Sequence, residues 1–278
     1  MTERMRADTF GEQATLRTLT VCGRTLRVSV RPGDGSLPPL LLMNGIGASL
    51  EVLQPFVDAL DPRREVIRFD VPGVGGSPRP VMPYTMATFT PVVAGLLSQL
   101  GHRDPVDVLG FSWGGGLAQQ FAVQYRRRCR RLVLAATGMG SLMVPAHPRV
   151  LSRMLTPRRH RDPGYARWIA GEIYGGTMRQ HPERAAQVLH SDSRLGPRRG
   201  YYYQLVAGAG WTSLPLLPMI KQPTLVIAGD DDPIIPAANP RLMARLIPDA
   251  QLHLYRGGHL ALVTETRELT PVVERFLG

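Results

Sequence analysis

The sequence predicts an α/β protein with a mainly parallel, eight-stranded sheet that carries helices on both faces. Two observations favour this class. Short apolar runs recur along the chain, and from the third run onward helical patterns separate most of them. With 278 residues, 44% of them hydrophobic, the chain is long enough to bury one core of this kind.

The strands are expected at eight places, namely near 18–22, 26–30, 39–43, 65–69, 106–110, 131–136, 224–228 and 251–255. The first two are expected to form an antiparallel lead-in. Helical patterns that would cover the sheet lie near 49–60, 86–100, 112–125, 239–247 and 265–277. In such a sheet, functional groups collect at the C-terminal ends of the strands.

Residues 138–220 interrupt this alternation and are interpreted as a mostly helical cap inserted into the core. The core then consists of residues 1–137 and 221–278. The inserted segment is longer than one crossover needs and is rich in Met, Tyr and Trp. Any one of these side chains is expected to pack the cap onto the core, but as a group they favour an apolar substrate. Candidate pocket residues are Met139, Tyr174 and Trp211.

The segment Gly110-Phe111-Ser112-Trp113-Gly114 directly follows a predicted strand and precedes a helical pattern. This setting is typical of a nucleophile elbow, a turn so sharp that the neighbours of the serine must be small. Ser112 is therefore the candidate nucleophile, and it needs a histidine as base and an acid to orient that histidine.

The acid and the base are sought downstream, because the fold that uses this elbow places them in the order serine, acid, histidine. The spacing after the strand near 224–228 selects Asp232, whereas Asp230 and Asp231 are interpreted as turn-forming or solvated carboxylates. His259 follows two glycines after the last strand and is the candidate base. His253 lies within that strand, and the five other histidines precede the acid.

Two backbone amides are expected to stabilise a developing oxyanion. One belongs to Trp113, which follows the nucleophile, and the other is assigned to Ile46 in the turn after the strand near 39–43. Asn44, Gly45 and Gly47 complete this turn. Asn44 either holds the loop by a side-chain hydrogen bond or is a turn asparagine without a role in the site.

Several function classes are disfavoured. The glycine-rich turn at 70–77 has neither the lysine nor the spacing of a phosphate-binding loop, so we interpret it as scaffold. The net charge of +11 comes from arginine clusters without interleaved aromatic residues, which favours a solvated basic face over nucleic-acid binding. If this face has a partner, an anionic lipid or a coated particle fits better than DNA.

The two cysteines, Cys22 and Cys129, lack metal-site spacing and are expected to be free, mostly buried thiols in a reducing compartment. The N-terminal residues show no signal peptide, and no run is apolar enough to span a membrane, so the cytoplasm is the expected location. The sequence carries no signal for an oligomeric state.

Several segments resemble, in order, the intracellular medium-chain-length poly(3-hydroxyalkanoate) depolymerases of the α/β-hydrolase superfamily. They cover most of the chain from about residue 38 and are residues 44–48, 70–77, 110–122, 132–137, 174–176, 210–213, 222–236 and 258–260. The resemblance implies Ser112, Asp232 and His259 as a catalytic triad. It also implies cofactor-free cleavage of stored polyester to 3-hydroxy acids or oligomers at a granule surface.

Other functions of the same fold stay open. A small-molecule carboxylesterase, a lactonase or a carbon–carbon bond hydrolase would use the same triad and cap. A binding or granule-coat protein without activity is also compatible with the fold, because a fold does not fix a function, although the complete triad argues against it.

Overall fold

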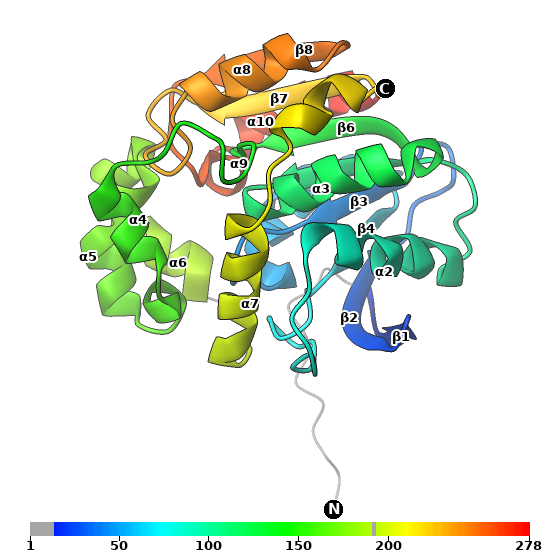
Figure 1. Ribbon diagram of the computed structural model, residues 1–278, viewed down its shortest axis with the longest axis horizontal. Coiled ribbons are helices and arrows are strands. Elements are labelled where there is room, and N and C mark those ends of the chain that lie inside the picture. Colours follow the sequence, from blue (N-terminus) through cyan, green and yellow to red (C-terminus); the bar gives the residue numbers. More distant parts are fainter. Residues whose placement is uncertain (1–13, 191–192) are drawn as a thin grey trace, which may run out of the picture.

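The structure of the chain is a computed structural model that describes residues 14–190 and 193–278. It confirms the eight-stranded, mainly parallel sheet, whose strand order is β1-β2-β4-β3-β5-β6-β7-β8 (Figure 1). The strands are β1 (Thr15–Val21), β2 (Arg24–Arg31), β3 (Leu40–Met43), β4 (Val66–Phe69), β5 (Val106–Phe111), β6 (Cys129–Ala135), β7 (Thr224–Gly229) and β8 (Ala250–Tyr255).

The antiparallel lead-in is also confirmed. β1 and β2 form a hairpin, β2 pairs antiparallel with β4, and the strands from β4 to β8 are parallel. The hairpin turns through Cys22 and Gly23, which both have positive φ angles, 49° and 71°, as a tight two-residue turn requires. Cys22 is therefore exposed, and the expectation that it is buried was wrong; Cys129 is buried.

The side chains of the sheet alternate between two apolar layers. In β3, Leu40 and Leu42 pack in one layer, whereas Leu41 and Met43 pack in the other. The first layer includes side chains of α1 (Gln54–Ala59), α9 (Ala261–Thr264) and α10 (Thr266–Leu277). The second includes side chains of α2 (Met86–Gln99), α3 (Trp113–Gln124) and α8 (Ala238–Leu246). Helices thus cover both faces, as Figure 1 shows.

The segment between β6 and β7 is helical, and we refer to its residues 138–220 as the cap. Its α-helices are α4 (Pro148–Met154), α5 (Pro163–Tyr174), α6 (Glu183–His190) and α7 (Arg198–Ala209). Helices α4, α5 and α6 gather at one end of the sheet, beside α7 (Figure 1). Short 3-10 helices complete the fold: η1 (Leu50–Leu53), η2 (Arg126–Arg128), η3 (Pro157–His160), η4 (Gly176–Arg179) and η5 (Leu214–Met219).

The glycine-rich turn after β4 wraps around a carboxylate of the protein itself. Asp70 accepts hydrogen bonds from the backbone amides of Gly76 and Leu50, at 2.7 and 2.8 Å, and forms an ion pair with Arg27. Burial raises the pKa of Asp70 to about 6. A Cβ atom at Gly75 would lie 2.3 Å from an Asp70 oxygen, so the turn needs a glycine there.

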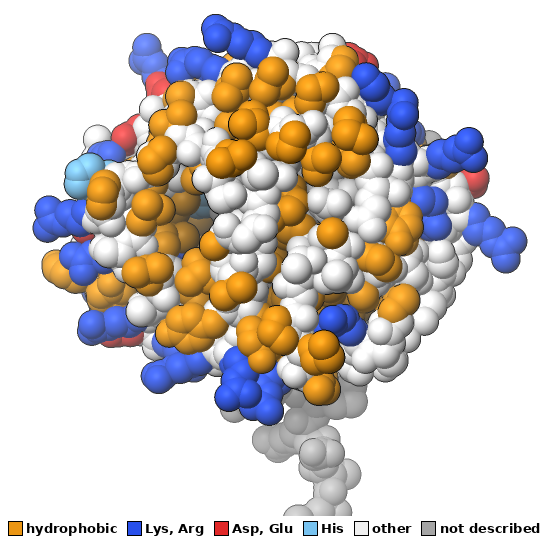
Figure 2. Space-filling view, viewed as in Figure 1, with side chains coloured by type: hydrophobic (Ala, Val, Ile, Leu, Met, Phe, Trp, Pro, Cys, Tyr) orange, Lys and Arg blue, Asp and Glu red, His pale blue; other side chains and the backbone are white. Residues whose placement is uncertain are grey.

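Among the residues that the structure describes, no helix has the length and apolar character needed to cross a membrane. Figure 2 shows one face of the molecule, on which Lys and Arg side chains form a rim around hydrophobic side chains.

Candidate active site

Ser112 lies at the turn between β5 and α3, where its backbone has φ 54° and ψ −118°. This left-handed conformation is rare for a residue with a side chain. Two hydrogen bonds hold it in place. The Ser112 amide donates to the Ala135 carbonyl at 2.9 Å, and the Thr137 hydroxyl donates to the Ser112 carbonyl at 2.7 Å.

Small residues are needed around the turn because backbone atoms approach it closely. A Cβ atom at Gly114 would lie 2.1 Å from the carbonyl oxygen of Met43, and one at Gly110 would lie 2.5 Å from the carbonyl oxygen of Gly114. Helix α3 can therefore begin directly against the loop after β3 only if both positions are glycine.

Ser112, His259 and Asp232 come together from three loops at the same end of the sheet. The Ser112 hydroxyl oxygen lies 2.9 Å from His259 Nε2, and His259 Nδ1 lies 2.8 Å from Asp232 Oδ2. The other Asp232 oxygen accepts the amides of Ile234 and Ile235 at 2.9 and 3.0 Å. With the carboxylate fixed in this way, the imidazole is oriented to take the proton of the serine hydroxyl.

The neighbouring aspartates have other partners. Asp231 forms an ion pair with Arg179 and accepts the Gly176 amide, and its hydrogen bonds with the guanidinium of Arg179 lower the pKa of its carboxyl. Asp230 accepts the Gly257 amide. Within the described chain, only Asp232 of these three forms a hydrogen bond with His259.

The end of α5 in the cap holds the loop that carries His259. The His259 amide donates to the Tyr174 carbonyl at 2.7 Å, and the two rings lie 6.4 Å apart in a stacked arrangement. The backbones touch directly at the next residues. A Cβ atom at Gly175 would lie 1.9 Å from the Asp231 carbonyl oxygen, and one at Gly176 would lie 2.2 Å from the Gly258 nitrogen.

The loop after β3 is shaped by two side chains. Asn44 donates to the Ser49 carbonyl at 2.7 Å, and its own side-chain oxygen accepts the Gly45 amide at 2.8 Å, so Asn44 holds the loop. From α7, the Gln204 side-chain oxygen accepts the Gly47 amide at 2.8 Å. In the described part of the chain, the amides of Ile46 and Trp113 donate to no other group, so both are free to bind an oxyanion.

A small cavity of about 30 Å³ lies next to Ser112 and His259, and Tyr174 lines it. Apolar side chains from the core and the cap form much of the lining, namely Val52, Phe111, Met154, Leu189, Ile234 and Leu260. A cavity of this size holds a water molecule or two but no acyl chain.

Met139 and Trp211 do not line this cavity, which corrects their assignment to the pocket. Both pack on the opposite face of the sheet, where Met139 is fully buried. The Trp211 ring lies against Gly116 in α3, and its indole nitrogen donates to Gln120. The Trp211 side chain thus packs the base of the cap on α3.

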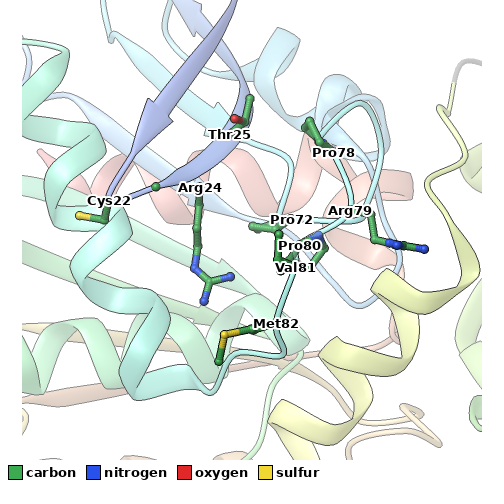
Figure 3. Close-up of a pocket in the computed structure, with 10 residues that line it drawn as sticks. Cys22, Arg24, Thr25, Pro72, Pro78, Arg79, Pro80, Val81 and Met82 are labelled. Carbon is green, nitrogen blue, oxygen red and sulfur yellow. The ribbon is translucent and has the colours of Figure 1, made fainter.

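A larger hollow of about 340 Å³ lies beside the β1–β2 turn. Figure 3 shows the residues that line it, with Met82 next to the Arg24 side chain and Arg79 on the opposite side from Cys22. Ser112, Asp232 and His259 do not line this hollow, so it is separate from the candidate site. Residues 14–190 and 193–278 contain no group of three or more His, Cys, Asp or Glu side chains arranged to hold a metal ion.

Comparisons with known proteins show the family of the chain. The profile of the alpha/beta hydrolase fold family matches residues 38–266, and the chain belongs to that family. The resemblance to the polyester depolymerases is also confirmed. Over 261 residues, the chain is 51% identical to the poly(3-hydroxyalkanoate) depolymerase of Ectopseudomonas oleovorans, and the match covers 94% of this chain and 92% of the relative.

Other relatives share the fold at lower identity. The 3-oxoadipate enol-lactonase 2 of Acinetobacter baylyi is 26% identical, over 88% of this chain and 90% of its own length. Among solved structures, a hydrolase from Pseudomonas aeruginosa PA01 is 29% identical with a TM-score of 0.78, covering 95% of this chain and 98% of its own.

Three residues near the site were not found from the sequence. Gln204 lies in a cap helix and contacts the loop after β3. Arg159 and His160, both in η3, line the cavity. The chain order of a triad excluded His160 as the base, but that order carries no information about the cavity wall.

Proposed function

We propose that the protein hydrolyses the ester bonds of poly(3-hydroxyalkanoate), with Ser112 as nucleophile, His259 as base and Asp232 as the acid that orients it. The unbroken hydrogen-bonded chain from Ser112 through His259 to Asp232, open to a cavity, carries this proposal. The 51% identity to a poly(3-hydroxyalkanoate) depolymerase supports the polyester as substrate.

In the first half of the reaction, His259 Nε2 takes the proton of Ser112 as the serine oxygen bonds to the ester carbonyl carbon. The free amides of Ile46 and Trp113 donate to the oxygen that becomes negative. When the carbon–oxygen bond of the ester breaks, His259 gives its proton to the leaving alkoxide. The products of this half are an acyl group on Ser112 and a chain fragment with a free hydroxyl.

In the second half, a water molecule gives a proton to His259 and attacks the acyl carbon. The bond to Ser112 then breaks, the acid product leaves, and the proton returns from His259 to the serine oxygen. One ester bond and one water molecule are consumed, and one hydroxyl and one carboxyl group are formed. No step requires a metal or an organic cofactor.

The substrate class follows from the cavity wall. The apolar lining fits the alkyl side chains of a medium-chain polyester, which would be cut to 3-hydroxy acids or oligomers. Because the cavity of about 30 Å³ is too small for an acyl chain, cap residues must move before such a chain can enter. We therefore propose that residues 138–220 act as a cap over a core formed by residues 1–137 and 221–278.

We propose that the protein acts in the cytoplasm, at the surface of polyester granules. Support comes from large apolar side chains exposed on the cap, among them Leu142, Leu155, Trp168 and Val206. Figure 2 shows such side chains on a face rimmed by basic ones, a combination suited to a particle coated with anionic lipid. The exposed free thiol of Cys22 fits a reducing compartment.

The Ser112→Ala variant tests this proposal. It should lose clearing of a medium-chain polyester emulsion and hydrolysis of p-nitrophenyl esters, with an unchanged circular dichroism spectrum. Turnover of either substrate at the wild-type rate would show that another nucleophile acts.

A hydrolase of soluble esters or lactones is the second candidate. The fold shared with the enol-lactonase of Burkholderia xenovorans LB400, which is 25% identical with a TM-score of 0.78, favours it. Wild-type activity on soluble esters without any clearing of polyester would favour this candidate.

A further inference from the structure

A buried cation lies in the wall of the candidate active site. Arg159, in η3 of the cap, is only 2% exposed and lines the same cavity as Ser112 and His259. Arg159 does not pair with an acidic side chain in the described part of the chain. Its cap neighbours Arg153 and Arg158 pair with Glu172 and Asp162, but no carboxylate in the described chain forms an ion pair with Arg159.

The side-chain partners of Arg159 are neutral. Its guanidinium donates to the Tyr201 hydroxyl at 2.8 Å, and the Tyr201 hydroxyl in turn donates to the Met154 carbonyl, so its proton is held there. Tyr174 also hydrogen-bonds with Arg159, and burial raises the pKa of Tyr174 to about 12, which keeps this phenol protonated. The positive charge is therefore buried without a compensating negative one, a costly arrangement that a bound anion would relieve.

A second polar group, the imidazole of His160, faces the same cavity and interacts with the backbone of Ile46. His160 is 7% exposed, and its Nε2 atom forms no hydrogen bond in the described structure. Burial holds the pKa of His160 well below its ordinary value, with the positive charge of Arg159 adding to the effect, so the ring is neutral. Its Nε2 atom is available for one hydrogen bond with a ligand.

We propose that Arg159 binds the free carboxylate at the end of a polyester chain or oligomer, so that the enzyme removes units from that end. This inference rests on the proposed function. A poly(3-hydroxyalkanoate) chain has one carboxylate, on its terminal unit, and cleavage of the last ester releases that unit as the leaving alcohol. Its carboxylate is only a few bonds from the broken ester, and Arg159 and Ser112 line the same cavity, which would hold both groups once the cap has moved. The planar guanidinium matches a carboxylate with two parallel hydrogen bonds.

The first test uses the wild-type enzyme and needs no substitution. 3-Hydroxyoctanoate and its neutral amide, 3-hydroxyoctanamide, are compared as inhibitors of p-nitrophenyl ester hydrolysis. The acid should inhibit at a concentration at least about tenfold lower than the amide, since the amide leaves the cation unpaired. Equal inhibition by an enzyme that clears polyester would overturn this inference and leave the proposed function intact. An enzyme that does not clear polyester would contradict the proposed function itself.

The second test locates the effect at Arg159. In Arg159→Met, which keeps an unbranched apolar stem but removes the charge, the preference for acid over amide should fall to about one, and Arg159→Lys should retain part of it. The ratio is the readout because a general loss of activity does not change it. Arg158→Met is the matched control, since Arg158 is exposed and paired with Asp162, and its ratio should stay at the wild-type value. A wild-type ratio in folded Arg159→Met would overturn the proposal.

Discussion

The side-chain oxygen of Gln204 lies 2.8 Å from the amide nitrogen of Gly47, so a cap helix holds the loop that follows β3. Gln204 is completely buried, and its backbone carbonyl also accepts the indole N–H of Trp113 at 2.8 Å. One cap residue thus contacts both segments that carry the proposed oxyanion donors, Ile46 and Trp113. The cap contributes to the geometry of the reaction centre as well as to the cavity wall.

Replacement of Gln204 should therefore slow the chemical step. Gln204→Leu removes the acceptor of the Gly47 amide, and kcat for p-nitrophenyl esters should fall at least about tenfold, with a smaller change in KM. Gln251→Leu, at an exposed position of β8, is the control and should behave as wild type. Equal kcat values for the two variants would contradict a positioning role for Gln204.

The three aspartates after β7 should differ sharply in importance. Asp232→Asn removes the carboxylate that orients His259 and should lower kcat by about 10⁴-fold. Asp230→Asn and Asp231→Asn should lower it far less, because those side chains hold the Gly257 amide and Arg179 instead. Steady-state kinetics of the three variants measure this difference. If Asp230→Asn or Asp231→Asn lowered kcat more than Asp232→Asn, the choice of acid would be wrong.

The contact between the cap and the loop that carries His259 can be tested with a Gly176→Ala variant. Its new Cβ atom would lie 2.2 Å from the Gly258 nitrogen, so the loop that carries His259 must shift and kcat/KM should fall at least about tenfold. Gly35→Ala is a matched control, because Gly35 also has a positive φ angle but has open space around it. It should cost about 1 kcal/mol of stability and leave kcat/KM unchanged. Similar kinetics for both variants would refute the contact.

Asp70 should make the stability of the fold depend on pH. Its pKa is raised from 3.8 to about 6 by burial, so the folded protein binds more protons than the unfolded protein between these values. Its contribution to the free energy of unfolding is present below pH 3.8 and is lost as the pH rises through about 6. The free energy of unfolding of wild type relative to Asp70→Asn should thus decrease by about 1–3 kcal/mol from pH 4 to pH 7. Urea denaturation at both pH values measures this; an increase would contradict the buried-acid interpretation.

The sheet was predictable from the sequence because its signals are local. Each buried strand is a short apolar run, and glycine or polar residues follow most of these runs from β3 onward. The elbow was predictable for the same reason, since Gly110 and Gly114 lie on either side of Ser112 in the sequence as they do in space. Asp232 and His259 could be chosen because both follow strand ends, which meet at one edge of a parallel sheet.

The cavity wall was not predictable because its residues meet only through the packing of the cap. Aromatic content indicated that the cap is apolar, but it could not tell that Tyr174 faces the cavity whereas Trp211 packs on α3. Arg159 lies in an arginine-rich stretch that resembles a solvated surface, and only the fold shows that it is buried while Arg158 is exposed. Cys22 was predicted to be buried because cysteines usually are, but it lies in a two-residue hairpin turn, where its side chain is exposed.

The backbone of Ser112 also bears on the heat resistance of this protein. A residue held in a left-handed conformation costs about 1–3 kcal/mol, which the rest of the molecule offsets in every copy, with or without substrate. Glycine adopts that conformation without strain, so the Ser112→Gly variant should unfold at a higher temperature than the wild type. Selection for thermal stability alone would thus replace the proposed nucleophile with glycine.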